Sequence, residues 1–220
     1  MTTLRSIDAR ISERHLLKHP FYRAWSRGEL SLPTLARYAR EYYHFESNFP
    51  RYVGGTYARL ADPRARRLLL ENLTDEEGRD PTHPALWADF ASHLGVPRAD
   101  LGARPPRGAT ADLCRTYEHL TVDGTGASGL GALYAYESIF PEVAAEKSRG
   151  LRAHYGIEET AAHEFFRVHT SADVEHSRAE RRVLRALIER SPIAGRAALR
   201  GVDGALGGWW RFLDSFGVPA

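Results

Sequence analysis

Apolar residues recur along this chain mostly at intervals of three or four, which is the period of an α-helix. No segment shows sustained alternation with a period of two between hairpin turns, so the pattern does not favour strands. The first helical region is predicted at residues 5–26, and the Pro- and Gly-rich segment 97–109 is predicted to be a loop. The other helices are predicted at 31–50, 63–78, 82–95, 110–122, 127–149, 158–190 and 193–216.

Residues with strong preferences for helix ends mark several of these boundaries. Ser31 is a suitable N-cap for the second helix, and Pro33 fits its first turn. Pro63 opens the next helix and Gly78 closes it, while Thr82 caps the helix that follows. The sequence therefore predicts an all-α fold, in which seven or eight helices pack as one bundle-like domain over residues 1–220.

Composition and charge narrow the class of protein. Hydrophobic residues make up 43% of the chain and charged residues 26%, which is ordinary for a domain with a sizeable core. The net charge of +2 comes from interleaved charges of both signs, so no nucleic-acid partner is expected. Neither a secretory signal nor an apolar run of roughly 18 residues is present, so no membrane association is expected. Because Cys114 is the only cysteine, we expect a cytoplasmic protein without a cysteine-based metal site.

Three polar residues share one face of the long helix predicted at 158–190. His169, Asp173 and His176 stand at relative positions 0, +4 and +7, and steps of 100° place these within an arc of about 60°. An apolar stripe leads into the triplet on the same face, so the triplet is expected to face the core. Burying two imidazoles and a carboxylate without partners would cost several kcal/mol, and a metal ion is one candidate partner.

Two further segments offer ligands, although each also has a structural explanation. Glu76 and His83 flank a helix end marked by Gly78 and Pro81, so their side chains can meet at one metal ion. Alternatively, Glu76 is a solvated acid and His83 a surface residue. Glu137 is the only acid in a long apolar run, where a glutamate is rarely buried without a partner. It is either a metal ligand or half of a structural ion pair.

Together these segments provide three carboxylates and three imidazoles, from Glu76, His83, Glu137, His169, Asp173 and His176. Hard oxygen and nitrogen donors suit iron or manganese, and zinc less well. Two divalent ions against three carboxylates leave a net charge of about +1, which hydroxide or peroxide would balance. The set is therefore typical of a non-haem dinuclear site that activates dioxygen.

These residues and several longer segments resemble those of the haem-oxygenase-like di-metal oxidases. The chain looks most similar to the family of the chlamydial protein associating with death domains, whose members act in the folate pathway. The resemblance implies the haem-oxygenase-like bundle of TenA- and PqqC-like proteins, and all six ligands match in order. It covers nearly the whole chain, through LLKHPFYRAWSRGELSL, YAREYYHFESNFPRYV, LLENLTDEEG, HPALWADFASHLG, GLGALYAYESIFPEVAAEKSRGL and FFRVHTSADVEH.

Members of that family look like unusual para-aminobenzoate synthases, so the resemblance implies this activity here. A tyrosine of the protein itself would be oxidised and excised to give the aromatic ring, and a lysine would supply the amine. The resemblance places these roles on Tyr22 and Lys147. It also implies two transition-metal ions, Fe/Fe or Mn/Fe, with dioxygen and a reductant as co-substrates. A homodimer and a single turnover per polypeptide are further expectations.

Apart from the resemblance, the sequence supports the role of Lys147 more than that of Tyr22. Lys147 is one of only two lysines among 30 basic residues, which favours a functional amine, although an ordinary surface position is the alternative. It stands ten residues after Glu137, about 15 Å along a continuous helix, and its lean towards the N-terminus shortens that gap. Tyr22 is otherwise a core aromatic, and Tyr136 is a candidate redox relay or hydrogen-bond partner. Further tyrosines that line the cavity or the core are Tyr38, Tyr42, Tyr43 and Tyr134.

The sequence also admits other functions. The same metal site would suit a diffusible small molecule, through N-oxygenation, C–C cleavage or desaturation, with Tyr22 and Lys147 incidental. A metal-free relative, such as a thiaminase-like hydrolase or a cofactorless oxidase, is less well supported, because Cys114 has no base near it in sequence. A pure binding protein would leave the ligand set unexplained.

Overall fold

The computed structural model describes residues 2–78 and 80–219, and all regular structure within them is helical. Three short turns of 3₁₀- or π-helix accompany the α-helices: η1 (Leu16–Lys18), η2 (Arg98–Asp100) and η3 (His119–Asp123). The α-helices are α1 (Leu4–Glu13), α2 (Pro20–Arg27), α3 (Leu32–Glu46), α4 (Phe49–Arg59), α5 (Pro63–Glu77), α6 (His83–His93), α7 (Gly108–Glu118), α8 (Gly126–Glu137), α9 (Phe140–Tyr155), α10 (Thr160–Arg190) and α11 (Pro192–Asp214).

The all-α prediction is confirmed, but the chain is divided into more helices than the seven or eight expected. Prolines mark the extra breaks. Pro20 begins α2 within the region predicted as one helical stretch. Pro50, at the end of the helix predicted at 31–50, lies in the first turn of α4, a helix that was not predicted. The predicted helix 127–149 is interrupted between α8 and α9, where Pro141 lies in the first turn of α9. Proline is tolerated in a first turn but breaks a helix interior, so each proline starts a new helix.

The predicted helix ends agree with the structure in position. The Ser31 side chain accepts a hydrogen bond from the backbone N–H of Thr34 at the start of α3. Thr82 occupies the N-cap of α6, although its side chain makes no capping bond. Gly78 ends α5 with a φ of −84°, so this end does not use the left-handed glycine conformation.

Helix α8 lies at the centre of the bundle, and each of its residues is buried. It packs closely against α11, because glycines remove the side chains that would separate the two backbones. A Cβ on Gly131 would collide with the backbone of Ala198, and one on Gly201 would collide with the carbonyl of Ser128. The close approach holds α8, which ends at Glu137, against α11.

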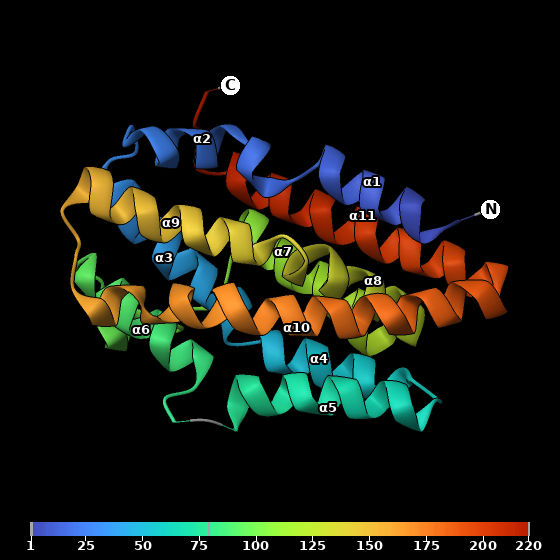
Figure 1. Ribbon diagram of the computed structural model, residues 1–220. Coiled ribbons are helices and arrows are strands. Elements are labelled where there is room, and N and C mark those ends of the chain that lie inside the picture. Colours follow the sequence, from blue (N-terminus) through green and yellow to red (C-terminus); the bar gives the residue numbers. More distant parts are fainter. Residues whose placement is uncertain (1, 79, 220) are drawn as a thin grey trace.

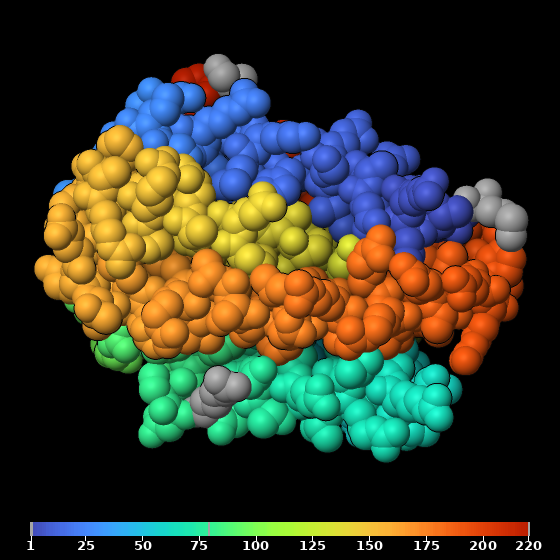
Figure 2. Space-filling model, in the orientation of Figure 1, coloured from blue at the N-terminus to red at the C-terminus, as the bar shows by residue number. Residues whose placement is uncertain are grey.

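Helix α10 runs the length of the molecule between α9 on one side and α5 on the other (Figure 1). Among the described residues it also contacts α1, α6, α8 and α11. On the face shown in Figure 2, side chains of α5, α9 and α10 close over this interior. None of the helices in the described part of the chain combines the length and apolar character needed to cross a membrane.

Candidate metal centre

The polar face predicted on the long helix lies inside the protein. His169, Asp173 and His176 all belong to α10, and their exposed fractions are 4%, 1% and 7%. Glu180 stands one turn further along the same face and is also buried. The polar stripe of α10 therefore has four members, and they face the helices that carry the other predicted ligands.

Glu76 and His83 meet across the turn between α5 and α6. Glu76 lies in the last turn of α5, and His83 is the first residue of α6. Both are buried, and the Nδ1 atom of His83 lies 2.8 Å from Oε2 of Glu76. Their burial contradicts the alternative of a solvated acid and a surface histidine.

Glu137 is the last residue of α8 and is also buried. Asn72 on α5 donates a hydrogen bond of 2.8 Å from Nδ2 to Oε1 of Glu137, while Oε2 has no hydrogen-bond partner among the described residues. Nδ1 of His176 lies 3.8 Å from Oε1. Glu137 thus faces an amide and an imidazole, and the carboxyl group of Glu180 adjoins it.

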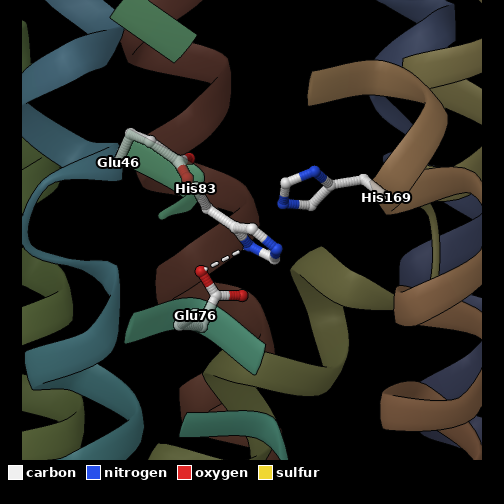
Figure 3. Close-up of side chains that lie close together, drawn as sticks. All are labelled: Glu46, Glu76, His83 and His169. Atoms are coloured by element: carbon white, nitrogen blue, oxygen red, sulfur yellow. Dashed lines mark hydrogen bonds and ion pairs between the residues drawn. The ribbon is translucent and has the colours of Figure 1, made fainter. Parts of the chain in front are cut away.

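The buried ligand atoms gather in two groups, and within each group all atoms lie within 4.8 Å of one another. The groups are Glu46, Glu76, His83 and His169, and Glu76, Glu137 and His176. Glu76 belongs to both groups, as a carboxylate that bridges two ions would. Figure 3 shows the first group, in which the two imidazoles and two carboxylates converge from four helices.

Asp173 lies beside the second group and belongs to neither. Its Oδ1 atom is 3.8 Å from Nδ1 of His176, and Oδ2 has no hydrogen-bond partner in the described part of the chain. The structure thus brings five of the six predicted ligands into two groups and leaves the sixth adjacent to one of them.

Each imidazole has one ring nitrogen engaged and the other directed at these groups. Nδ1 of His169 donates to the carbonyl oxygen of Phe165 at 2.7 Å, which leaves Nε2. Nε2 of His176 lies 3.0 Å from Oδ2 of Asp75, and its buried Nδ1 has no partner among the described residues. The same holds for Nε2 of His83. Phe165 and Asp75 are outside both groups, and such outer partners fix the ring orientation and tautomer of metal-binding histidines.

Burial dominates the electrostatics of the acidic groups. It raises the pKa of Glu46, Glu137 and Glu180, and the neighbouring carboxyl groups add to the rise for Glu46 and Glu180. It raises the pKa of Asp173 to about 7, against the neighbouring His176, which lowers it. Burial therefore disfavours the ionised form of each of these carboxyl groups.

The histidines respond to the same surroundings in different ways. Burial, with a contribution from His83, holds the pKa of His169 well below its usual range, so this ring is neutral. Burial also lowers the pKa of His176, but Asp173, Glu137 and Asp75 outweigh it and raise the value to about 10. A metal ion at this position would have to displace that proton.

Lys147 is completely buried, so the alternative of an ordinary surface lysine is wrong. The helix is interrupted between α8 and α9, so the separation of 15 Å between Glu137 and Lys147 that was expected along a continuous helix does not apply. The Nζ atom has no hydrogen-bond partner among the described residues, and burial holds the pKa of the amine well below its usual range. Six aromatic rings have their centres 4.5–5.8 Å from Nζ: those of Tyr22, Tyr38, Tyr42, Trp87, Phe140 and Phe166.

Tyr22 and Tyr136 stand at the two ends of a chain of phenols. The hydroxyl of Tyr22 lies 2.7 Å from that of Tyr38, and the hydroxyls of Tyr42 and Tyr136 are also hydrogen-bonded. The rings of Tyr38 and Tyr42 have centres 5.5 Å apart and connect the two pairs. Tyr136 precedes Glu137 at the end of α8 and Tyr22 belongs to α2, so the chain of phenols extends from the end of α8 to α2.

Residues 36–210 match a haem-oxygenase family described as iron-containing redox enzymes. The chain belongs to this family. A 4-aminobenzoate synthase of Chlamydia muridarum is 40% identical to this enzyme over 220 residues, which cover 100% of this chain and 92% of that protein. A 4-aminobenzoate synthase of Nitrosomonas europaea is 34% identical over 222 residues, covering 97% and 90%. A solved TenA homologue from Pseudomonas syringae, 17% identical, has a TM-score of 0.82 over 96% of this chain and 91% of its own, which confirms the fold.

The residues present in this enzyme fit a metal centre. Buried side-chain atoms without hydrogen-bond partners concentrate here, on Glu46, His83, Glu137, Asp173, His176 and Glu180. The site has five buried carboxyl groups among the described residues, whereas the sequence predicted three. With two divalent ions and all five groups ionised, the net charge of the site would be about −1 instead of about +1. Cations at this place would provide the partners that the enzyme's own side chains do not.

Two acids of this site were missed by the sequence reasoning. Glu46 ends α3 directly before Ser47 and Asn48, where an acid looks like a solvated helix end. Glu180 stands among charged residues on α10. A signal was nevertheless present in both cases: Glu46 falls four residues after Tyr42, and Glu180 four after His176, so each continues a buried stripe.

Cys114 does not have the character of a catalytic thiol. It is half-buried, and burial raises its pKa above the usual value. A nucleophilic cysteine needs the opposite shift. This counts against the hydrolase alternative for the enzyme.

Proposed function

We propose that this enzyme makes 4-aminobenzoate, a folate precursor, from its own chain, with Tyr22 supplying the ring and Lys147 the amine. The proposal is supported by relatives of that name that match nearly the whole chain. The observation that carries it is the position of the Lys147 amine, which is buried without a partner 5.6 Å from the centre of the Tyr22 ring. Two groups that react within one chain must lie together in the folded protein, and these do.

The surroundings of Lys147 suit an amine that reacts. A neutral amine carries the electron pair that an ammonium group lacks, and burial favours the neutral form by lowering its pKa. Six rings surround Nζ, and Lys147 is completely buried among them. This favours an internal substrate over an added one.

The phenol chain suits the oxidation of Tyr22. Burial raises the pKa of Tyr22, so the phenol keeps its proton until the ring is oxidised. The hydroxyl of Tyr38 lies 2.7 Å away and holds the phenol of Tyr22 in place by a hydrogen bond. Tyr136 and Tyr42 would relay the oxidation from the side of the chain that adjoins Glu137.

We assign two transition-metal ions, Fe/Fe or Mn/Fe, to the two ligand groups, with dioxygen and an external reductant as co-substrates. When bound, the ions supply the oxidising power for Tyr22 by reducing dioxygen. His83 and His169 make the first group richer in nitrogen, which suits iron. The second group is richer in carboxylate, which suits manganese.

The test follows labelled tyrosine into the product. The protein is produced with ring-labelled tyrosine in a strain that cannot make 4-aminobenzoate. It is then loaded with Fe(II) and Mn(II) and exposed to dioxygen, reductant and unlabelled free tyrosine. The expected result is labelled 4-aminobenzoate, not exceeding one molecule per chain, with peptide mapping that locates the altered residue at Tyr22.

The variants separate the proposal from its main alternative. Tyr22→Phe and Lys147→Met are expected to abolish the product, whereas Tyr57→Phe and Lys18→Met retain it. Lys18 is a matched control, because it is the only other lysine and is exposed. Unlabelled product, or repeated turnover of an added small molecule, would contradict the proposal and favour an oxygenase that acts on a diffusible substrate.

A further inference from the structure

We infer that Glu46 is a seventh metal-binding residue, at the position that Glu76, His83 and His169 form. The inference rests on the dinuclear centre of the proposed function, and it is independent of which product the enzyme makes. It adds a ligand from α3, a helix that contributes none of the six predicted ligands.

Geometry places Glu46 within reach of the same ion as its neighbours. One of its carboxylate oxygens lies within 4.8 Å of the ligand atoms of Glu76, His83 and His169. Figure 3 shows Glu46 reaching this group from the side opposite His169. An ion among these atoms would be enclosed by side chains of α3, α5, α6 and α10.

Burial and missing hydrogen bonds show that Glu46 needs a cation. It is 2% exposed, and its Oε1 atom has no hydrogen-bond partner among the described residues. Lys147 is the basic side chain whose charge acts on it, but burial favours the neutral form of that amine. A carboxylate rarely remains buried without a partner, and a bound ion supplies one.

The position of Glu46 on its helix shows that the acid does not reach the interior by chance. Tyr38, Tyr42 and Glu46 are spaced four residues apart on α3, so they lie along one buried stripe. The two tyrosines line the Lys147 cage, and Glu46 extends the same stripe to the histidines. An apolar side chain would satisfy packing there, whereas a carboxylate adds a charge that packing does not require.

The donor count supports the same conclusion. Without Glu46, the first position holds two imidazoles and a share of Glu76. With Glu46 it has four protein donors and a carboxylate of its own, as the second position has in Glu137. Hard divalent ions such as Fe(II) and Mn(II) favour this mixture of oxygen and nitrogen.

The experiment titrates metal-free protein with Co(II) and records stoichiometry by equilibrium dialysis and coordination by the visible spectrum. The wild type is expected to bind two Co(II) per chain. Glu46→Gln is expected to bind one Co(II) as the wild type does and the other at least about tenfold more weakly, with an altered spectrum. Glu46→Asp keeps the charge but withdraws the carboxylate by one methylene, so a ligand role predicts weakening there too.

Two control variants separate a ligand from a general charge effect. Glu189→Gln removes an exposed acid from α10 and is expected to leave both affinities unchanged. Glu180→Gln removes a buried acid outside both groups and is expected to leave the first position intact. Near-UV circular dichroism verifies that every variant is folded.

The inference is overturned if Glu46→Gln and Glu46→Asp both bind two Co(II) with wild-type affinity and spectrum. Equal weakening of the first position by Glu180→Gln would also overturn it, because that result shows a charge effect. If the wild type itself binds fewer than two Co(II), the proposed dinuclear centre is wrong, and so is the ligand role of Glu46 within it. The two failures are therefore distinguishable.

Discussion

The buried amine of Lys147 should make the enzyme less stable than it would be with an apolar side chain. Lys147 is completely buried, and Nζ has no hydrogen-bond partner among the described residues. Methionine has nearly the same length and shape, and its sulfur packs well against aromatic rings. Lys147→Met therefore removes the buried polar group and retains most of the contacts with the six rings.

The expected gain follows from two effects. A buried polar group without a hydrogen bond costs about 1–3 kcal/mol in proteins, so Lys147→Met should raise the free energy of unfolding by about that amount. For a chain of this size, this corresponds to about 2–12 °C in Tm. The second effect is a dependence on pH, because the amine titrates differently in the folded and unfolded chains.

The sign of the pH effect follows from the lowered pKa. The unfolded chain holds the Lys147 proton below its usual pKa of 10.5, whereas the folded chain does not until a much lower pH. In that window the unfolded state binds more protons, so the wild type loses about 1.4 kcal/mol per unit as pH falls. Glu46 opposes the lowering and narrows the window. The stability advantage of Lys147→Met should therefore grow as pH decreases from about 10 towards 7.

The assay is chemical unfolding of metal-free protein at several pH values, with Lys18→Met as the control. Lys18 is exposed, so its replacement should change stability by less than about 0.5 kcal/mol and leave the pH dependence unchanged. A Lys147→Met variant that is less stable than the wild type would contradict the cost assigned to the buried amine. A difference in the free energy of unfolding that is constant with pH would contradict the lowered pKa of that amine.

Three further predictions concern packing, ligand orientation and metal loading. Gly201→Ala should lower the free energy of unfolding by about 1–3 kcal/mol in urea, because the new Cβ meets the Ser128 carbonyl; an unchanged midpoint would contradict the close packing. Asp75→Asn should weaken Co(II) binding about 10–100-fold, because it alters the partner of His176 Nε2; wild-type affinity would contradict that role. Metal affinity in calorimetry should fall as pH decreases through about 7, where Asp173 regains its proton; a flat profile would exclude Asp173 as a ligand.

Local sequence rules predicted much of the helical framework. Ser31 and Pro63 start helices where capping and proline preferences place them. The 0, +4, +7 spacing of His169, Asp173 and His176 correctly predicted one buried face, because helical periodicity depends only on residues close in sequence.

Properties that depend on distant contacts could not be predicted in the same way. The sequence left Lys147 either on the surface or at the site, because its burial results from the break between α8 and α9 and from the packing of α2, α3, α6 and α10. Glu46 was missed because its burial comes from α5, α6 and α10, which meet α3 far along the chain. Charge at a helix end is usually solvated, and tertiary packing overrides that tendency here.

A crystal structure of the loaded enzyme, with anomalous data at the iron and manganese edges, tests the dinuclear centre most directly. We expect two metal peaks about 3.5–4 Å apart, the usual spacing of two-metal sites. The carboxylate of Glu76 should lie between them, with His83 and His169 at one peak and His176 at the other. A single peak, or two peaks held by other residues, would contradict it.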